Sequence, residues 1–338
     1  MAEPTLVPSH RKFMSKHLKK LLAPGLGVLL FALLIRLGRD GLQSVIAAAN
    51  AHFMLLALMV SMPNYPLVSW RWKSITDSIA GRSVANFLAF LRVRVVSATS
   101  GLVAPRELAE FGSRTYWLVQ FHKLPLATAI QCVLMDRSCD MLISLTALTA
   151  SLLYWCGVVT SLNGALAVFG FCLASCFMLP SMLNVALVYV LAVLRNLTRA
   201  QTGYRKTLPT RMLSFLQILE GVSRPVWRAA LLWSFAKFSL MVARNILVAR
   251  AFDLQLSDSI LVVVTPLSQV FFLAALTPGS LGIYEAGWAG ILGSYAIEPA
   301  KVAAYLIATR LALIFSVTCM IPIFFFPQAV LDRADRTP

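Results

Sequence analysis

Long apolar segments limit the folds that this sequence can adopt. A helix that crosses a lipid bilayer needs about 20 mostly apolar residues. Six segments are close to this length or longer: Leu21–Leu37, Phe53–Trp70, Leu126–Trp155, Leu162–Leu194, Ala229–Phe252 and Lys301–Phe326. The segment Leu162–Leu194 fits either one tilted helix bent at Pro180 or a helix with a short continuation. We therefore predict an all-α polytopic membrane protein with about six full spans.

The composition agrees with a chain that lies mostly in lipid. Of its 338 residues, 59% are hydrophobic and 13% are charged, whereas soluble domains have about 25% charged residues. The net charge is +16, which in a soluble protein would suggest nucleic-acid binding. In a membrane protein, Lys and Arg instead gather in cytoplasmic loops. We therefore expect membrane lipids as partners and no nucleic acid.

Two further apolar regions, Asn86–Phe121 and Ile260–Ile297, are interrupted by turn-forming residues. Non-helical backbone at membrane depth is tolerated only where it is buried in protein or lines a wet cavity. We therefore predict two re-entrant helical hairpins. The predicted turn residues are Pro105 in the first hairpin and Pro278, Gly279 and Gly282 in the second.

A row of glycines follows the second predicted turn. Gly287, Gly290 and Gly293 recur at intervals of three, and a stripe of small residues allows helices to approach closely. The preceding segment TPGSLG also offers backbone amides at the start of a helix, where an anion can bind.

The charges of the loops predict an orientation. Three polar segments are basic: residues 1–17, Arg71–Arg82 and 195–228. The loop Asp253–Asp258 is acidic. If both hairpins return to their starting side, every basic loop and the tail 329–338 are cytoplasmic. We predict a cytoplasmic (inner) membrane protein with both termini in the cytoplasm and a transmembrane domain over residues 18–328.

The two halves of this domain, about residues 53–155 and 229–326, look like an internal repeat. A shift of 173 residues places Arg71 on Arg244, Pro105 on Pro278 and Arg137 on Arg310. Glu110 and Glu285 correspond when two residues are inserted. The predicted orientation makes the halves inverted repeats, an arrangement that in transporters places the substrate at broken helices near mid-membrane.

Charged residues within the predicted spans need an explanation. One charge at the bilayer centre costs about 2.5–3.5 kcal/mol on insertion scales, and Leu126–Trp155 contains Asp136, Arg137 and Asp140. The two aspartates share a face, and Arg137 is close enough along the helix to pair with Asp140. This segment therefore either lies near the cytoplasmic interface or faces a polar cavity.

A second charged group involves the other half of the chain. Arg310 lies in the middle of the last span and Glu285 in the second hairpin. They form either a structural ion pair or a site in which Arg310 binds an anionic headgroup, because the planar guanidinium suits phosphate. Lys237 and Arg244 share one face of their span, and Arg244 lies deep enough to join the same cavity.

Sequence motifs for catalysis are almost entirely missing. The chain has no GxxxxGK[ST], HExxH or GxSxG motif, and its six cysteines and four histidines are too scattered for a metal site. We therefore expect that the chain binds no cofactor and no metal and that it is not an enzyme. The alternative is a Mg²⁺-dependent prenyl-phosphate transferase that uses Asp136 and Asp140.

The segment TPGSLGIYEAGWAGILG, followed by Pro299 and by the arginine in IATRLALIF, resembles the C-terminal signature of the lysylphosphatidylglycerol synthase transmembrane family. This is the flippase-like domain of multiple peptide resistance factors. The upstream segments VAPRELAEFGSR and VLMDRSCDML resemble the other signature, and the likeness covers roughly residues 18–328. The family usually has a second glycine where Ser280 stands and an Arg-like residue where Tyr284 stands, and these departures concern the substrate class.

The resemblance implies transfer of lipids between leaflets, without the soluble domain that carries synthase activity. The residues it implies for function are Pro105, Glu110, Arg114, Arg137, Asp140, Pro278, Gly279, Gly282, Glu285 and Arg310. In the leading hypothesis, a flippase, Arg137 and Arg310 bind an anionic headgroup, and Asp140 and Glu285 release it or couple its movement to protons.

Three matters stay open. The cargo can be an anionic phospholipid, a polyprenyl-linked sugar or a terpenoid lipid. A non-transporting membrane partner, whose basic loop at 195–228 binds a soluble lipid enzyme, is a further alternative. The sequence also leaves the formation of a homo-oligomer open.

Overall fold

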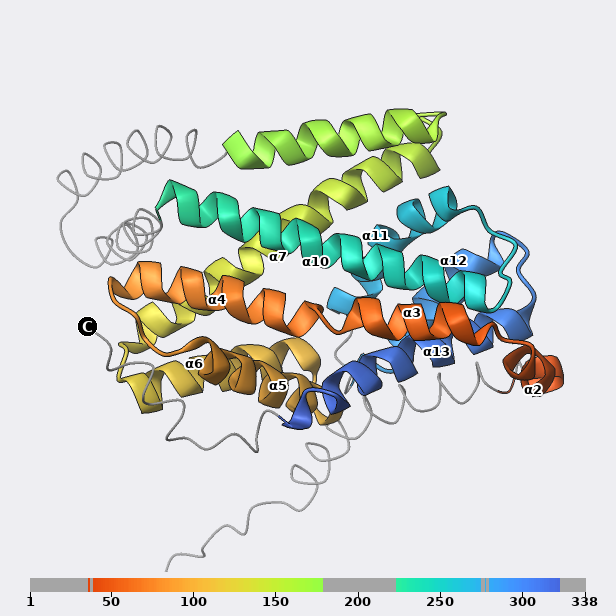
Figure 1. Ribbon diagram of the computed structural model, residues 1–338. Coiled ribbons are helices and arrows are strands. Elements are labelled where there is room, and N and C mark those ends of the chain that lie inside the picture. Colours follow the sequence, from red (N-terminus) through yellow and green to blue (C-terminus); the bar gives the residue numbers. More distant parts are fainter. Residues whose placement is uncertain (1–35, 37–38, 179–222, 275–276, 278–279, 323–338) are drawn as a thin grey trace, which may run out of the picture.

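The structure is a computed structural model that describes residues 36, 39–178, 223–274, 277 and 280–322 (Figure 1). These residues form helices and connecting turns, with no strand among them, so the predicted all-α class is confirmed. The helices are α2 (Arg39–Ala47), α3 (Ala51–Ser61), α4 (Asn64–Ala80), α5 (Phe87–Val103), α6 (Arg106–His122), α7 (Leu126–Trp155), Leu162–Met178, α10 (Arg224–Ala251), α11 (Asp258–Ala274), α12 (Ile283–Gly293) and α13 (Pro299–Thr318).

Four helical stretches are long and apolar enough to cross a membrane: Ala51–Ala80, Leu126–Trp155, Arg224–Ala251 and Pro299–Thr318. They correspond to four of the six predicted spans. The predicted span Leu21–Leu37 lies outside the described residues, apart from Arg36, and so do residues 1–17, 195–222 and 329–338. Of Leu162–Leu194, the structure describes the helix Leu162–Met178, so the stretch around Pro180 lies outside as well.

The second span differs from its prediction. The apolar segment ends at Trp70, and Arg71–Arg82 was predicted to be a loop, but the helix continues to Ala80 and Arg71 is fully buried. Aspartates of α7 neutralise Arg71, so the helix does not have to end where the charge begins. The helix ends instead at Gly81, whose positive φ of 65° suits glycine.

Both interrupted regions form a helix, a break and a second helix. The first break lies at Ala104 and Pro105, and Pro105 directly precedes α6, where the missing N–H of proline is harmless because the first amides of a helix have no partner within it. In the second break the structure describes Thr277 and residues 280–282, whereas Pro278 and Gly279 lie outside the described residues.

The helices follow the same order twice. The long stretch Ala51–Ala80 is followed by the shorter α5 and α6 and the long α7. After the described helix Leu162–Met178, the long α10 is likewise followed by the shorter α11 and α12 and then by α13. Figure 1 shows α4 and α10 side by side and running in opposite directions. A backbone hydrogen bond of 2.9 Å from Asn50 to Ala251 joins the start of α3 to the end of α10.

Buried clusters of apolar side chains hold the helices together. Trp72 and Phe90 belong to a buried cluster of α4 to α7, and Trp288 and Tyr305 belong to another that joins α3 and α10 to α13. Many large apolar side chains are exposed, among them Phe121, Leu145 and Phe171. An apolar outer surface of this extent is typical of helices that face lipid.

Candidate functional site

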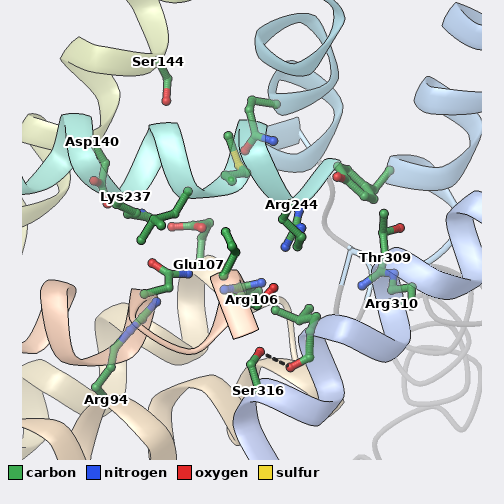
Figure 2. Close-up of a pocket in the computed structure, with 18 of the residues that line it drawn as sticks. Arg94, Arg106, Glu107, Asp140, Ser144, Lys237, Arg244, Thr309, Arg310 and Ser316 are labelled. Carbon is green, nitrogen blue, oxygen red and sulfur yellow. Dashed lines mark hydrogen bonds and ion pairs between the residues drawn. The ribbon is translucent and has the colours of Figure 1, made fainter. Parts of the chain in front are cut away.

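A cavity of about 210 Å³ lies between the two groups of helices. It is lined by residues of the first half of the chain, in α3 to α7, and of the second half, in α10 to α13. Among the described residues, six cationic side chains line it: Arg94, Arg106, Arg137, Lys237, Arg244 and Arg310. Figure 2 labels all of these except Arg137. Of the lining residues that the structure describes, two are carboxylates, Glu107 and Asp140. The lining is therefore strongly cationic.

One wall of the cavity is built around Glu110, which is fully buried. Its carboxylate forms ion pairs with Arg94 of α5 and Arg137 of α7, and it accepts a hydrogen bond of 2.9 Å from Nε of Arg106. Arg114, one turn further along α6, lies 3.7 Å from it. One carboxylate thus has four guanidinium neighbours and cannot neutralise them all.

A second network surrounds Arg71, which reaches α7 from α4. Its Nε donates to Asp136 at 2.7 Å, and its Nη2 donates to Asp140 at 3.0 Å. Arg114 contacts the other oxygen of Asp136 at 2.7 Å, and Lys237 of α10 contacts Asp140 at 2.6 Å. The interpretation of Asp140 as the partner of Arg137 is therefore wrong, because Arg137 turns to Glu110 and Glu107.

Near the second break, Arg310 of α13 forms an ion pair with the fully buried Glu285. The other oxygen of Glu285 accepts the N–H of Gly282 at 2.7 Å, directly before α12 begins. The guanidinium of Arg310 also lies 5.5 Å from the centre of the Tyr284 ring. The carboxylate of Glu285 thus holds both the start of α12 and the arginine of α13.

Arg244 differs from the other arginines of the cavity. Its guanidinium donates to the side chain of the adjacent Asn245, at 3.0 Å from Nη2. Asn245 in turn donates to Thr265 at 3.2 Å. Within the described part of the chain, no carboxylate lies within ion-pair distance of Arg244. Lys237 and Arg244 both line the cavity, in accordance with their predicted common face.

Positive charge exceeds negative charge in the site as a whole. Besides the lining residues, Arg71, Arg114, Glu110, Asp136 and Glu285 lie directly behind the wall. In the described part of the chain, the cavity and its wall together contain eight cationic and five carboxylate side chains. A concave site of one sign with apolar surroundings attracts and concentrates ions of the opposite sign. The arrangement suits an anion.

Sequence reasoning found most but not all of this site. The structure brings together seven of the predicted residues: Glu110, Arg114, Arg137, Asp140, Arg244, Glu285 and Arg310. The sequence predicts that Arg71 lies in a loop, and it indicates no role for Arg94 or Arg106. The predicted repeat contains a signal for Arg71, because the shift of 173 residues pairs it with Arg244.

The glycines after the second break play unequal parts. A Cβ at Gly287 would lie 2.3 Å from Cγ of Phe271 on α11, so glycine is needed for the contact between the two helices. A Cβ at Gly290 or Gly293 would meet nothing within 4 Å. The predicted packing stripe is therefore wrong for these two positions.

Comparison with known protein families matches residues 20–320 to the lysylphosphatidylglycerol synthase TM region. No curated protein and no solved structure is significantly similar to the chain. The family match covers most of the chain, including every described residue of the cavity and its wall. The chain therefore belongs to the lysylphosphatidylglycerol synthase transmembrane family, a family of membrane domains linked to lipid handling.

Proposed function

We propose that this protein is a lipid transporter that moves a lipid with an anionic headgroup between the leaflets of the cytoplasmic membrane. The observation that carries the proposal is the cavity with six cationic and two carboxylate side chains. The membrane family and the apolar outer surface support it. The headgroup enters the cavity while the hydrocarbon tails stay in the surrounding lipid.

The sign of the charge selects the headgroup. Guanidinium groups bind phosphate oxygens through paired N–H donors, and these charged hydrogen bonds are strong. A cationic headgroup would instead meet Arg106, Arg244 and Arg310 with few carboxylates to offset the repulsion. An anionic phospholipid or a lipid-linked phosphate fits this site best.

The arrangement of helices supports a translocation path. In this proposal the two groups of helices are inverted repeats, and α5–α6 and α11–α12 are re-entrant hairpins that line the path. Arg137 and Arg310 contact the headgroup, and they form their ion pairs with Glu110 and Glu285 again when the lipid leaves. Both termini lie in the cytoplasm. Transporters built this way alternate access by moving one repeat against the other.

The competing enzyme hypothesis receives less support. A Mg²⁺ site needs carboxylate oxygens that are free to bind the ion. Both aspartates are instead paired with cationic side chains: Asp136 with Arg71 and Arg114, Asp140 with Arg71 and Lys237. We therefore propose transport without covalent chemistry.

Reconstituted vesicles provide the test. The purified protein is reconstituted into liposomes that contain phosphatidylglycerol or phosphatidylcholine with a fluorescent NBD group on an acyl chain. Dithionite then bleaches the NBD groups in the outer leaflet. Separate samples carry no gradient, a proton gradient or a membrane potential. We expect the protein to expose inner-leaflet phosphatidylglycerol faster than phosphatidylcholine in at least one condition.

Two variants sharpen this test. Arg310→Gln removes a cation of the cavity and is expected to slow transport of the anionic probe. Arg250→Gln is the matched control, because Arg250 is half exposed and pairs with Asp258 away from the cavity. Bleaching of both probes at the rate of protein-free vesicles under every gradient would overturn the proposal.

A further inference from the structure

The repeat relates more than the residues that first revealed it. The shift of 173 residues places the surroundings of Arg71 on residues near Arg244. The correspondences are Asp136 with Thr309, Asp140 with Leu313, Ser61 with Ser234, and Asn64 with Lys237. Ser234 and Lys237 come from the second half and lie at the site of Arg71, whereas their counterparts Ser61 and Asn64 come from the first half and lie at the site of Arg244. A two-fold exchange of the halves requires this crossing. The two arginines can therefore be compared site by site.

Around Arg71 the site is complete. The guanidinium is enclosed by Asp136, Asp140 and the hydroxyl of Ser234. Lys237 approaches the carboxylate of Asp140 from α10, at 2.6 Å. The carboxylate of Asp140 is thus held between an arginine of one half and a lysine of the other.

Around Arg244 the same frame is present without its anions. Ser61, Asn64, Thr309 and Leu313 all line the cavity together with Arg244. The positions of both aspartates are occupied by uncharged side chains. The side-chain oxygen of Asn64 is buried and has no hydrogen-bond partner among the described residues, and rotation of its amide presents N–H donors instead. In Figure 2, Arg244 points from α10 into the space between Arg106 and Arg310.

We propose that Arg244 binds the phosphate of the lipid headgroup, and that this phosphate takes the place which the carboxylate of Asp140 has beside Arg71. A partly buried arginine without a counterion is costly, and a bound anion offsets that cost. The amide of Asn64 supplies further donors, whereas the hydroxyl of Ser61 already donates to the carbonyl of Ala57. Arg137 and Arg310, which pair with Glu110 and Glu285 in the structure, surround the phosphate with positive charge. The inference rests on the proposed anionic cargo and names its anchoring residue.

The test restores the missing carboxylate. Leu313→Asp gives Arg244 an internal counterion at the position that corresponds to Asp140, and Leu313→Asn is its uncharged control of the same shape. Thr309→Asp does the same at the position of Asp136. Arg244→Gln removes the anchor itself. Each variant is checked for folding by size exclusion and by its melting temperature in detergent.

Binding is measured by calorimetry in detergent with three water-soluble probes: dihexanoyl phosphatidylglycerol, dihexanoyl phosphatidylcholine and inorganic phosphate. We expect Arg244→Gln and Leu313→Asp each to weaken binding of the phosphatidylglycerol probe by about tenfold or more, the scale of one charged hydrogen bond. Leu313→Asn stays within about twofold of the wild type. If phosphate alone binds as tightly as the lipid probe, the site serves free phosphate and the lipid assignment is overturned.

The double variant Arg244→Gln/Leu313→Asp separates a specific effect from a general one. If the new carboxylate acts by occupying Arg244, it has little further effect once that arginine is gone. Losses that add in full would mean a general change of charge and would overturn the role of Arg244. Unchanged binding in well-folded Arg244→Gln overturns it as well, and the proposed function then survives through Arg137 and Arg310. A wild type that does not prefer phosphatidylglycerol to phosphatidylcholine contradicts the proposed function itself.

Discussion

At the scale of single residues, the buried charges are stabilised only as a set. Asp136 lies between Arg71 and Arg114, with 2.7 Å to each, and all three side chains are almost completely buried. Moving each charge out of water is expensive, and the mutual attraction returns this energy only while every partner is present. Loss of one carboxylate therefore leaves two arginines with too little negative charge.

Asp136→Asn is expected to cost about 3–5 kcal/mol of stability, because it leaves buried charges without compensation. Asp258→Asn is the matched control, since Asp258 pairs with Arg250 where both side chains are about half exposed, and such pairs contribute about 1 kcal/mol or less. Melting in detergent, followed by fluorescence-detected size exclusion, compares the two. Equal melting temperatures for the two variants would contradict the structural role of Asp136.

The sequence predicts which residues carry charge into the bundle, but not which residues pair. The rule for neighbours on one helix suggested Arg137 with Asp140. The observed partners of Asp140 are Arg71 and Lys237, which are 69 and 97 residues away. Such pairs depend on how distant helices are packed, and no local pattern contains that information. The predicted repeat adds one long-range relation from sequence alone, the correspondence of Arg71 with Arg244.

At the scale of helices, apolar length predicts the elements well and their ends less well. The span Leu126–Trp155 has the same limits in the prediction and in the structure. The span that starts at Phe53 continues ten residues beyond its predicted end at Trp70, because hydropathy does not show that a distant aspartate will neutralise an arginine. The contact between α11 and α12 is similar, since spacing alone did not distinguish Gly287 from Gly290.

Gly287→Ala is expected to destabilise the protein by about 1–3 kcal/mol, the usual cost of overpacking. The new methyl group would lie 2.3 to 2.8 Å from Cγ, Cδ2 and Cβ of Phe271, and Cβ cannot move without the backbone of α11. Gly290→Ala, with no atom within 4 Å, should be neutral or slightly stabilising. Melting temperatures test this. Adding Phe271→Ala should reduce the cost of Gly287→Ala in part, because it removes Cγ and Cδ2 but keeps Cβ, and it should give no such relief in Gly290→Ala.

At the scale of the whole molecule, charge divides the bundle into two ends. The turns 81–86 and 123–125 carry Arg82 and Lys123, and a hydrogen bond of 3.4 Å from Arg82 to the backbone of His122 shows that they are neighbours. The turns 252–257 and 294–298 carry Asp253 and Glu298 and lie at the other end of α10. Lys and Arg collect on the cytoplasmic side of membrane proteins. The first pair of turns is therefore expected in the cytoplasm and the second pair outside.

Labelling of single cysteines tests this orientation and both hairpins together. Cys156 is exposed in the turn after α7 and is kept while the other five cysteines are replaced by serine. Arg82→Cys, Gln255→Cys and Ser294→Cys are each placed in a cysteine-free chain, and all three positions are exposed. In intact spheroplasts, a membrane-impermeant maleimide should label Cys156, Gln255→Cys and Ser294→Cys, and it should label Arg82→Cys only after lysis.

Gln255 and Ser294 flank α11 and α12, so labelling from opposite sides would show that this pair of helices crosses the membrane instead of returning. Labelling of Arg82→Cys from outside with protection of the other three would reverse the orientation. The proposed inverted relation of the halves is compatible with that outcome too, because α4 and α10 run in opposite directions.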